Sequence, residues 1–295
     1  MKMIKVLIVI MPLIILNTNQ SISQTRDKKY LAFSGMTKEQ AIEVQKAAAE
    51  YFNLPLNLKI TLNETTFIEL VLIPPGEFKM GSNTSKEKTA ELFGRNARSY
   101  DLEHPQHTVR ITKPFYINRY EITQSQWNAL MENNPSPIHK PNLPVQNLSW
   151  DDCKEFCKLL SSKIGKNFRL PTEAEWEFAC RAGTRTEFYF GNELSKKQAN
   201  YDSDAAIPVG SYPPNAWGLF DMHGNVVEWV EDYYYFYSED SKTDPWETEY
   251  PHGGRMLRGG GYAYKVRALR SAYRYAHLKS MGDQNSGFRI VCPIE

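Results

Sequence analysis

The feature that most limits what this chain can fold into is the long stretch after Gly183, which lacks a sustained helical pattern. From 184 to 295 glycine, proline, tyrosine and tryptophan recur, and apolar residues seldom return at the spacing of an amphipathic helix. Short runs that suit strands occur at "VVEWV", "RMLRGG" and "GFRIVC". Such a domain must satisfy its buried loop backbone with side chains, water or ions. The stretch therefore predicts a loop-rich α+β domain with little regular secondary structure.

Helices are predicted upstream of this stretch, where a capping side chain precedes its partner by three residues. These capping boxes are Thr37 with Gln40, Thr123 with Gln126, Ser149 with Asp152, and Thr172 with Glu175. Gly165 and Gly183 stand where helix C-caps belong. "LKITLNETTFIELVLIPPGEF" predicts two strands joined near Asn63, and "TVRITKPFYINRYEIT" predicts another pair. Residues 24–64 are interpreted as an accessory N-terminal helix and a lead-in strand, ahead of the main domain at 65–295.

The N-terminus has the pattern of a secretory signal. Lys2 and Lys5 precede an apolar run from Val6 to Leu16, and "SIS" stands just before Gln24. A helix of that run is too short to cross the roughly 30 Å of hydrocarbon in a bilayer. We expect a signal peptide at 1–23, with an uncleaved anchor as the alternative, and an extracytoplasmic protein after cleavage. No other segment is apolar enough to span a membrane, so no span is expected in the mature chain.

The segment "RGGGYAYKVRALRSAYRYA", which begins at Arg258, is rich in arginine and tyrosine. Its composition suits a phosphate cradle or a stacking platform for nucleic acid. The whole chain has a net charge of only +1, however, whereas nucleic-acid binders carry a clear basic excess. The glycines also lack the strand and helix context of a phosphate-binding loop. No nucleic-acid partner is therefore expected.

The chain has four cysteines, at positions 153, 157, 180 and 292. Cys153 and Cys157 fall on one stripe with Phe156, Leu160 and Ile164, which is the apolar face of a predicted helix. Both thiols are thus expected in the core, with no neighbouring ligands for a metal.

Eight motifs together carry a resemblance to a known family. They are "IPPGEFKMGS" (73–82), "EHPQHTVRITKPFYINRYEITQSQW" (103–127), "PVQNLSWDDCKEFC" (144–157), "FRLPTEAEWEFACRAG" (168–183), "GSYPPNAWGLFDMHGNVVEWVEDYY" (210–234), "LRGGGY" (257–262), "RSAYR" (270–274) and "GFRIV" (287–291). In this order they resemble the sulfatase-modifying-factor family, whose best-known member is the formylglycine-generating enzyme. The resemblance implies a single domain related to C-type lectins.

The resemblance also implies a chemistry that this sequence does not support. Enzymes of the family oxidise a cysteine of sulfatases to formylglycine with a copper(I) ion held by two cysteines between "RGG" and "RxxxR". Here no cysteine occurs between Cys180 and Cys292. Soft Cu(I) prefers thiolate ligands, so we expect no copper and no catalytic residues of this type.

The sequence favours a module that binds a ligand or assists assembly or maturation, and two other functions are alternatives. One is an oxidase of the formylglycine-generating type, or a related one, that uses other ligands, for which His223 and His277 are candidates. The other is sugar binding, which rests on the fold alone. Where the family has its active-site cleft, Tyr262, Tyr264, Lys265 and Arg267 are expected to line a groove for a peptide, protein or small-molecule ligand.

Three further expectations follow from the resemblance. The family's calcium site maps onto Asp221, Gly224, Val226 and Glu228, where it would have a structural role. A disulfide is expected between Cys157 and Cys292, with Cys180 unpaired. Arginines of the family motifs are expected to hold loops in place by donating to carbonyls and carboxylates, with Glu175, Glu177 and Glu228 as candidate partners. These arginines, called the framework arginines below, are Arg258, Arg270, Arg274 and Arg289.

Overall fold

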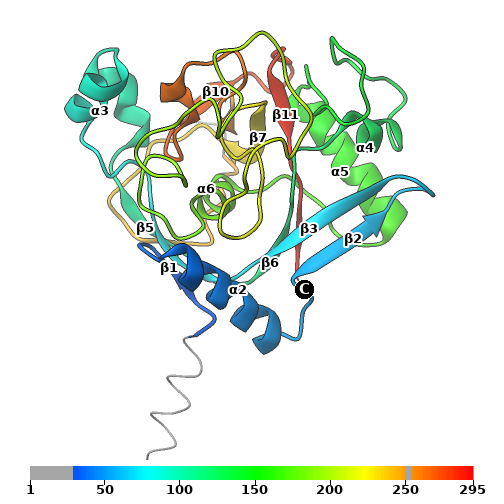
Figure 1. Cartoon of the computed structure of the whole chain (residues 1–295), viewed down its shortest axis with the longest axis horizontal. Helices are drawn as coiled ribbons and strands as arrows, with labels where there is room; N and C mark the ends of the chain where they lie inside the picture. Colours follow the sequence, from blue (N-terminus) through cyan, green and yellow to red (C-terminus); the bar gives the residue numbers. More distant parts are fainter. Residues whose placement is uncertain (1–28, 250–253, 295) are drawn as a thin grey trace, which may run out of the picture.

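The computed structural model describes residues 29–249 and 254–294 (Figure 1). The signal peptide expected at 1–23 lies outside the described residues. The helices are α2 (Lys38–Tyr51), α3 (Lys86–Phe93), α4 (Gln124–Asn128), α5 (Trp150–Ile164) and α6 (Glu173–Arg181), with 3-10 turns η1 (Ala97–Glu103) and η2 (Val266–Leu269). The strands are β1 (Ala32–Phe33), β2 (Asn57–Thr61), β3 (Phe67–Ile73), β4 (Gly76–Met80), β5 (His107–Ile111), β6 (Phe115–Asn118), β7 (Val227–Tyr233), β8 (Lys242–Thr243), β9 (Arg255–Arg258), β10 (Tyr275–His277), β11 (Ser286–Phe288) and β12 (Val291–Pro293). Between Gly183 and β7 there is neither helix nor strand, as the sequence predicts.

The strands form three small sheets, with the orders β1-β4-β5-β8, β10-β9-β7-β11 and β12-β6-β3-β2. The turn at Asn63 joins β2 and β3, whose antiparallel pairing confirms the predicted hairpin. The second predicted pair of strands is present as β5 and β6, which pair with different partners. One prediction needs correction, because "GFRIVC" is divided between β11 and β12, which lie in separate sheets. Consecutive strands that change sheets bring distant segments together around one core.

The four predicted capping boxes are all present, at α2, α4, α5 and α6. In each, the hydroxyl accepts from the backbone N–H three residues on, and that residue's side chain accepts from the cap in return. Gly165 ends α5 in the left-handed conformation, as predicted. At α6 the left-handed cap is Ala182, so Gly183 stands one position later than expected.

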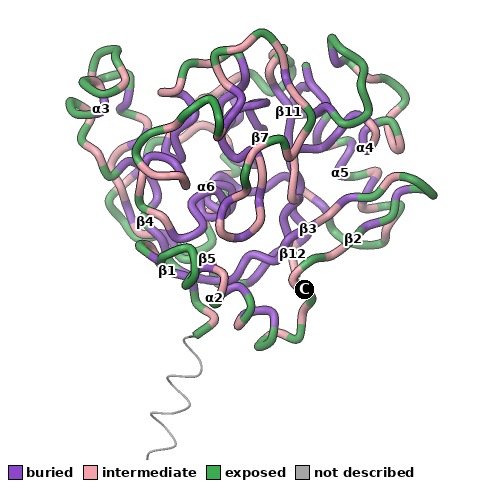
Figure 2. The backbone as a smooth tube through the Cα atoms, viewed as in Figure 1, coloured by how far each residue is buried: buried purple, intermediate pink, exposed green. Residues whose placement is uncertain are grey.

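Helix α6 lies at the centre of the molecule, and all nine of its residues are buried (Figures 1 and 2). Its sequence is not uniformly apolar, because Glu173, Glu175 and Glu177 alternate with apolar residues. Buried carboxylates require partners that compensate the lost hydration. The surroundings of α6 must therefore supply cations and hydrogen-bond donors, and two of the framework arginines, Arg258 and Arg274, are among them.

The N-terminal helix α2 packs against the core of the domain. Ala41 and Val44 of α2 pack in the same apolar cluster as Trp217. The amide of Gln45 donates to the carbonyls of Leu72 and Trp217, and the Trp217 indole donates to Ala41. Over the described ranges, no helix is long and apolar enough to span a membrane.

Candidate functional site

Arg258 shows how the framework arginines hold the loops. Its guanidinium is fully buried and lies 2.5 Å from Glu177 and 3.4 Å from Glu173 of α6. It also donates to the carbonyls of Ser271 and Tyr273, at 2.7 and 2.9 Å. One side chain thus joins the central helix to the segment 271–273, which has no regular structure of its own.

The other framework arginines repeat this arrangement with different partners. Arg274 forms two bonds of 2.7 Å with Glu173, and Arg270 forms bonds of 2.5 and 2.6 Å with Glu103. Arg289 pairs with Glu228 through two bonds of 2.6 Å. Each pair has the bidentate geometry that suits guanidinium and carboxylate.

Of the predicted acidic partners, Glu177 and Glu228 serve framework arginines, whereas Glu175 pairs with Arg169. Sequence reasoning missed Glu103 and Glu173. Burial would raise the pKa of Glu177, but Arg181 and Arg258 outweigh this, and the pKa lies below its ordinary value. Glu177 is therefore ionised, and its ion pair holds Arg258 in place.

The bond between Arg270 and Glu103 also creates a cleft, because it draws η1 against the segment 263–270. The cleft has a volume of about 400 Å³. We call it the tyrosine cleft, and its lining is Arg95, Ser99, Tyr100, Ala263, Tyr264, Lys265, Arg267, Ala268, Tyr273 and Tyr275. Gly260 allows the chain to turn back under η2, because a Cβ there would lie 2.6 Å from the Ala268 carbonyl oxygen.

Three of the four residues predicted for the cleft, Tyr264, Lys265 and Arg267, line it together. Tyr262 does not, since its side chain is buried in a small apolar cluster with Ala206 and Val226. Its backbone N–H donates to Asn225, and its carbonyl accepts from Ser203. Residues 262–264 form a turn, in which the Tyr264 N–H donates to the Gly261 carbonyl, and Tyr264 but not Tyr262 lines the cleft.

The charges of the cleft are unevenly distributed. Lys265 forms a 2.6 Å ion pair with Asp202 beside the cleft, and the Tyr264 hydroxyl donates to Asp283 at 3.0 Å. Arg95 and Arg267 form no ion pair with any residue in the described ranges. The lining thus holds three cationic side chains, of which only Lys265 is paired, and no Asp or Glu.

The cysteine and histidine closest to a catalytic arrangement are Cys180 and His223, whose Sγ and Nε2 atoms are 4.0 Å apart. His223 donates from Nδ1 to the Leu269 carbonyl at 2.7 Å and accepts from the Tyr189 N–H at Nε2. Burial lowers the pKa of His223 to about 3 and raises that of Cys180 to about 12. The imidazole stays neutral and the thiol protonated, so the pair does not supply a thiolate nucleophile.

Comparison with known proteins shows which family the chain belongs to. The family described as the sulfatase-modifying factor enzyme 1-like domain matches residues 59–294. The chain belongs to this family. The solved structure of Treponema denticola variable protein 1 superimposes with a TM-score of 0.72 at 25% identity, over 81% of this chain and 100% of that protein. The expected single α+β domain, C-type-lectin-like and low in regular structure, is therefore confirmed.

Relatives with this family's domain carry different names. Serine/threonine-protein kinase pkn1 of Chlamydia caviae is 33% identical over 246 residues, which are 77% of this chain and 38% of the relative. The formylglycine-generating enzyme of Mus musculus is 31% identical over 241 residues, 72% of this chain and 62% of the enzyme. The chain spans less than two thirds of either relative, so family membership alone does not give it an activity.

The positions expected to hold the family's calcium lie close together but have other partners. Both carboxylate oxygens of Glu228 accept from Arg289, and one also accepts from the Trp176 indole at 2.6 Å. Asp221 accepts from the Gly210 N–H, and burial raises its pKa to about 6. The set of Asp221, Gly224, Val226 and Glu228 does not fit calcium while Arg289 holds Glu228. Among the residues described, no three or more His, Cys, Asp or Glu side chains form a cluster suited to a metal.

Sequence reasoning missed a buried carboxyl beside this site. Glu121 accepts from the Val226 N–H at 2.9 Å and from the Asn225 amide at 2.7 Å. Burial and the charge of Asp221 raise its pKa well above the usual range. Its signal in the sequence is an acid within "NRYEIT", between strand and helix.

The disulfide expected between Cys157 and Cys292 stays a prediction. Both residues are buried and lie in the same apolar cluster. Cys153 and Cys157 point into the core, as the helical stripe predicts.

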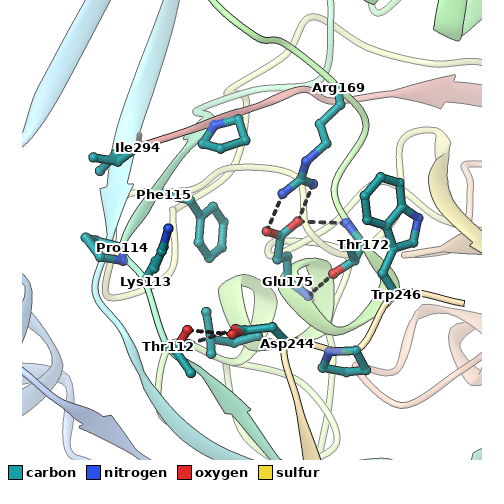
Figure 3. A pocket seen from close by; sticks show the side chains of 13 residues that line it. Thr112, Lys113, Pro114, Phe115, Arg169, Thr172, Glu175, Asp244, Trp246 and Ile294 are labelled. Atoms are coloured by element: carbon teal, nitrogen blue, oxygen red, sulfur yellow. Dashed lines mark hydrogen bonds and ion pairs between the residues drawn. The ribbon is translucent and has the colours of Figure 1, made fainter.

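A second pocket, of about 260 Å³, lies between α6, the β5–β6 turn and the segment after β8 (Figure 3). Arg169 closes one side with two bonds to Glu175, of 2.6 and 2.7 Å, and Thr112 donates to Asp244 on the other. Glu175, Asp244 and Arg169 thus have partners inside the pocket, whereas Lys113 has no ion pair with a described residue.

Proposed function

We propose that this chain is a binding or assembly module of its family, whose tyrosine cleft holds a peptide, protein segment or small molecule without copper oxidase chemistry. One observation carries the proposal: the residues that line the cleft include no cysteine and no histidine. The thiols of Cys157 and Cys180 are buried, and burial raises the pKa of each to about 12. A soft metal would have no thiolate to bind there.

The lining instead suits non-covalent recognition. Tyrosine rings provide large apolar surfaces with a polar edge, and guanidinium groups provide several donors in a fixed plane. The framework arginines hold the walls of the cleft, which therefore stays formed without ligand. A preformed site loses less conformational entropy when the ligand binds.

A turnover assay separates this proposal from the oxidase alternative. The purified protein, with and without added copper, is incubated in air with a peptide containing Cys-x-Pro-x-Arg, and mass spectrometry follows the cysteine. We expect no formylglycine and no oxygen consumption above that of a boiled sample. The proposal would be overturned if the peptide's cysteine became formylglycine with the folded protein but not with the boiled sample.

We further propose that the protein is extracytoplasmic after cleavage at 1–23. The basic start and short apolar run support this. N-terminal sequencing of protein recovered outside the cytoplasm should begin near Gln24. An intact N-terminus at Met1 would favour the anchor.

Calcium stays a proposal that competes with the ion pair between Glu228 and Arg289. Binding would require Glu228 to exchange the guanidinium for the ion, because both of its oxygens are occupied. Thermal unfolding with calcium and with chelator separates the two. Equal midpoints with calcium and with chelator support the ion pair between Glu228 and Arg289. A higher midpoint with calcium, but not with magnesium, supports calcium binding.

A further inference from the structure

Two arginines enter the tyrosine cleft from opposite walls. Arg95 lies between α3 and η1, and Arg267 lies in η2. The charges of both lower the pKa of Tyr100 and of Tyr273, although burial raises each pKa overall. Both guanidinium groups line the same cleft as these two rings.

Neither guanidinium has a counter-ion among the described residues. The framework arginines, Arg169 and Arg181, in contrast, all pair with carboxylates. Glu103 lies near Tyr100 and Tyr273, but both of its oxygens are bound by Arg270. This end of the cleft therefore has positive charge that no nearby acid offsets.

The other end has the opposite character. The Tyr264 hydroxyl donates to Asp283, and the charge of Asp283 raises the pKa of both Tyr264 and Tyr275, after the effect of burial. Four tyrosines line the space between the ends. The cleft is thus polarised, with arginines at one end and a carboxylate behind the tyrosines at the other.

We infer, building on the proposed binding function, that the ligand carries an oxyanion which Arg95 and Arg267 bind together, next to an aromatic or other planar group that packs against the tyrosines. A carboxylate or phosphate offers at least two oxygens in the geometry that guanidinium forks match. Aromatic rings prefer offset or edge contacts with planar groups, and Tyr264, Tyr273 and Tyr275 line the cleft with partly exposed rings. Asp283 sets the orientation, because it repels the oxyanion from the Tyr264 end.

The test measures binding of four probes to the full protein at low salt: phenyl phosphate, benzoate, inorganic phosphate and phenol. We expect phenyl phosphate to bind most tightly, inorganic phosphate and benzoate more weakly, and phenol not measurably. Arg95→Gln and Arg267→Gln should each weaken phenyl phosphate at least about tenfold, as the loss of one charged hydrogen-bonding group predicts. The benzoate and phosphate arms distinguish a carboxylate ligand from a phosphorylated one.

Arg98→Gln is the matched control, because Arg98 lies on η1, three residues from Arg95, and does not line the cleft. It should bind phenyl phosphate as the parent does. Asp283→Asn should bind it no less tightly, since it removes a negative charge. Far-ultraviolet circular dichroism confirms that each variant is folded.

Three results would overturn the inference: phenol binding as tightly as phenyl phosphate, no binding of any oxyanion probe, or equal loss in the Arg95 and Arg98 variants. None of these three results contradicts the proposed function, which fails only if the Cys-x-Pro-x-Arg peptide is oxidised. The two claims can therefore fail separately.

Discussion

Arg267 and Arg270 stand one helical turn apart in the same segment, and their surroundings differ completely. The Arg270 guanidinium is fully buried and bonded twice to Glu103, whereas Arg267 is half-buried and faces the tyrosine cleft without an ion pair to a described residue. A buried charge is tolerated only with a well-placed partner, while a charge at the rim of a cleft retains water. The ion pair thus distinguishes Arg270, which holds the framework, from Arg267, which faces the cleft.

The largest effect is expected from breaking a framework pair. Arg270→Met leaves Glu103 as an uncompensated buried carboxylate and should lower the free energy of unfolding by about 3–5 kcal/mol. Arg267→Met should change it by less than about 0.5 kcal/mol. Urea unfolding of the two variants measures this difference directly. Similar losses in both would show that the two arginines do not differ as described.

A smaller loss is expected at the second pocket. Arg169→Met removes two charged hydrogen bonds to Glu175, whose side chain is 11% exposed, and should cost about 1.5–3 kcal/mol in the same assay. Lys113→Met is its control, because Lys113 lines the same pocket without an ion pair. If Lys113→Met lowered the free energy of unfolding as much as Arg169→Met, the bonds between Arg169 and Glu175 would not explain the loss.

A pH effect of the order of 1–3 kcal/mol is expected from Asp232. Burial and the neighbouring charge of Glu173 raise its pKa to about 8, and it accepts from the N–H groups of Glu173 and Glu247. Because the folded state holds this proton more tightly than the unfolded state, its contribution to stability is complete below about pH 4 and declines as pH rises to about 8.

The measurement is urea unfolding of the parent and of Asp232→Asn at several pH values. The difference between them should change steadily across this window, because asparagine has no proton to lose. A constant difference would mean that Asp232 is ionised throughout and that the loop at Glu247 is not fastened by a neutral carboxyl.

The smallest change is expected from thiol reagents on the folded protein. Cys157 and Cys180 are buried with raised pKa values, so iodoacetamide should leave both unmodified until the chain is unfolded. Peptide mapping after labelling in native and denaturing buffer checks this. Rapid labelling of Cys180 in native buffer would instead indicate that the thiol beside His223 is reactive.

The sequence predicted the parts of the fold that depend on local chemistry. The capping boxes at Thr37, Thr123, Ser149 and Thr172 are local hydrogen-bond patterns, and each appears in the structure. Sheet membership was not predictable, because β5 and β6 are neighbours in sequence and yet pair with segments far along the chain. The ordered motifs identified the family where periodicity could not.

The site was predicted from one wall only. Tyr264, Lys265 and Arg267 belong to the segment that the motifs singled out, but Arg95 and Tyr100 come from a region that no motif marked. Tyr262 was misplaced because the direction of a side chain in a turn depends on contacts with distant segments, here the backbone of Asn225 and Ser203. Glu103 and Glu173 were missed as partners because a buried pair forms between segments far apart in sequence.

The most direct test of the account follows arginine side-chain signals by NMR as phenyl phosphate is added to the folded protein. The account predicts that the Nε–H signals of Arg95 and Arg267 shift together and saturate, while those of Arg258 and Arg270 stay in place. If the framework signals moved as much as the cleft signals, or if neither Arg95 nor Arg267 responded, the distinction between paired and unpaired arginines would not locate the ligand site.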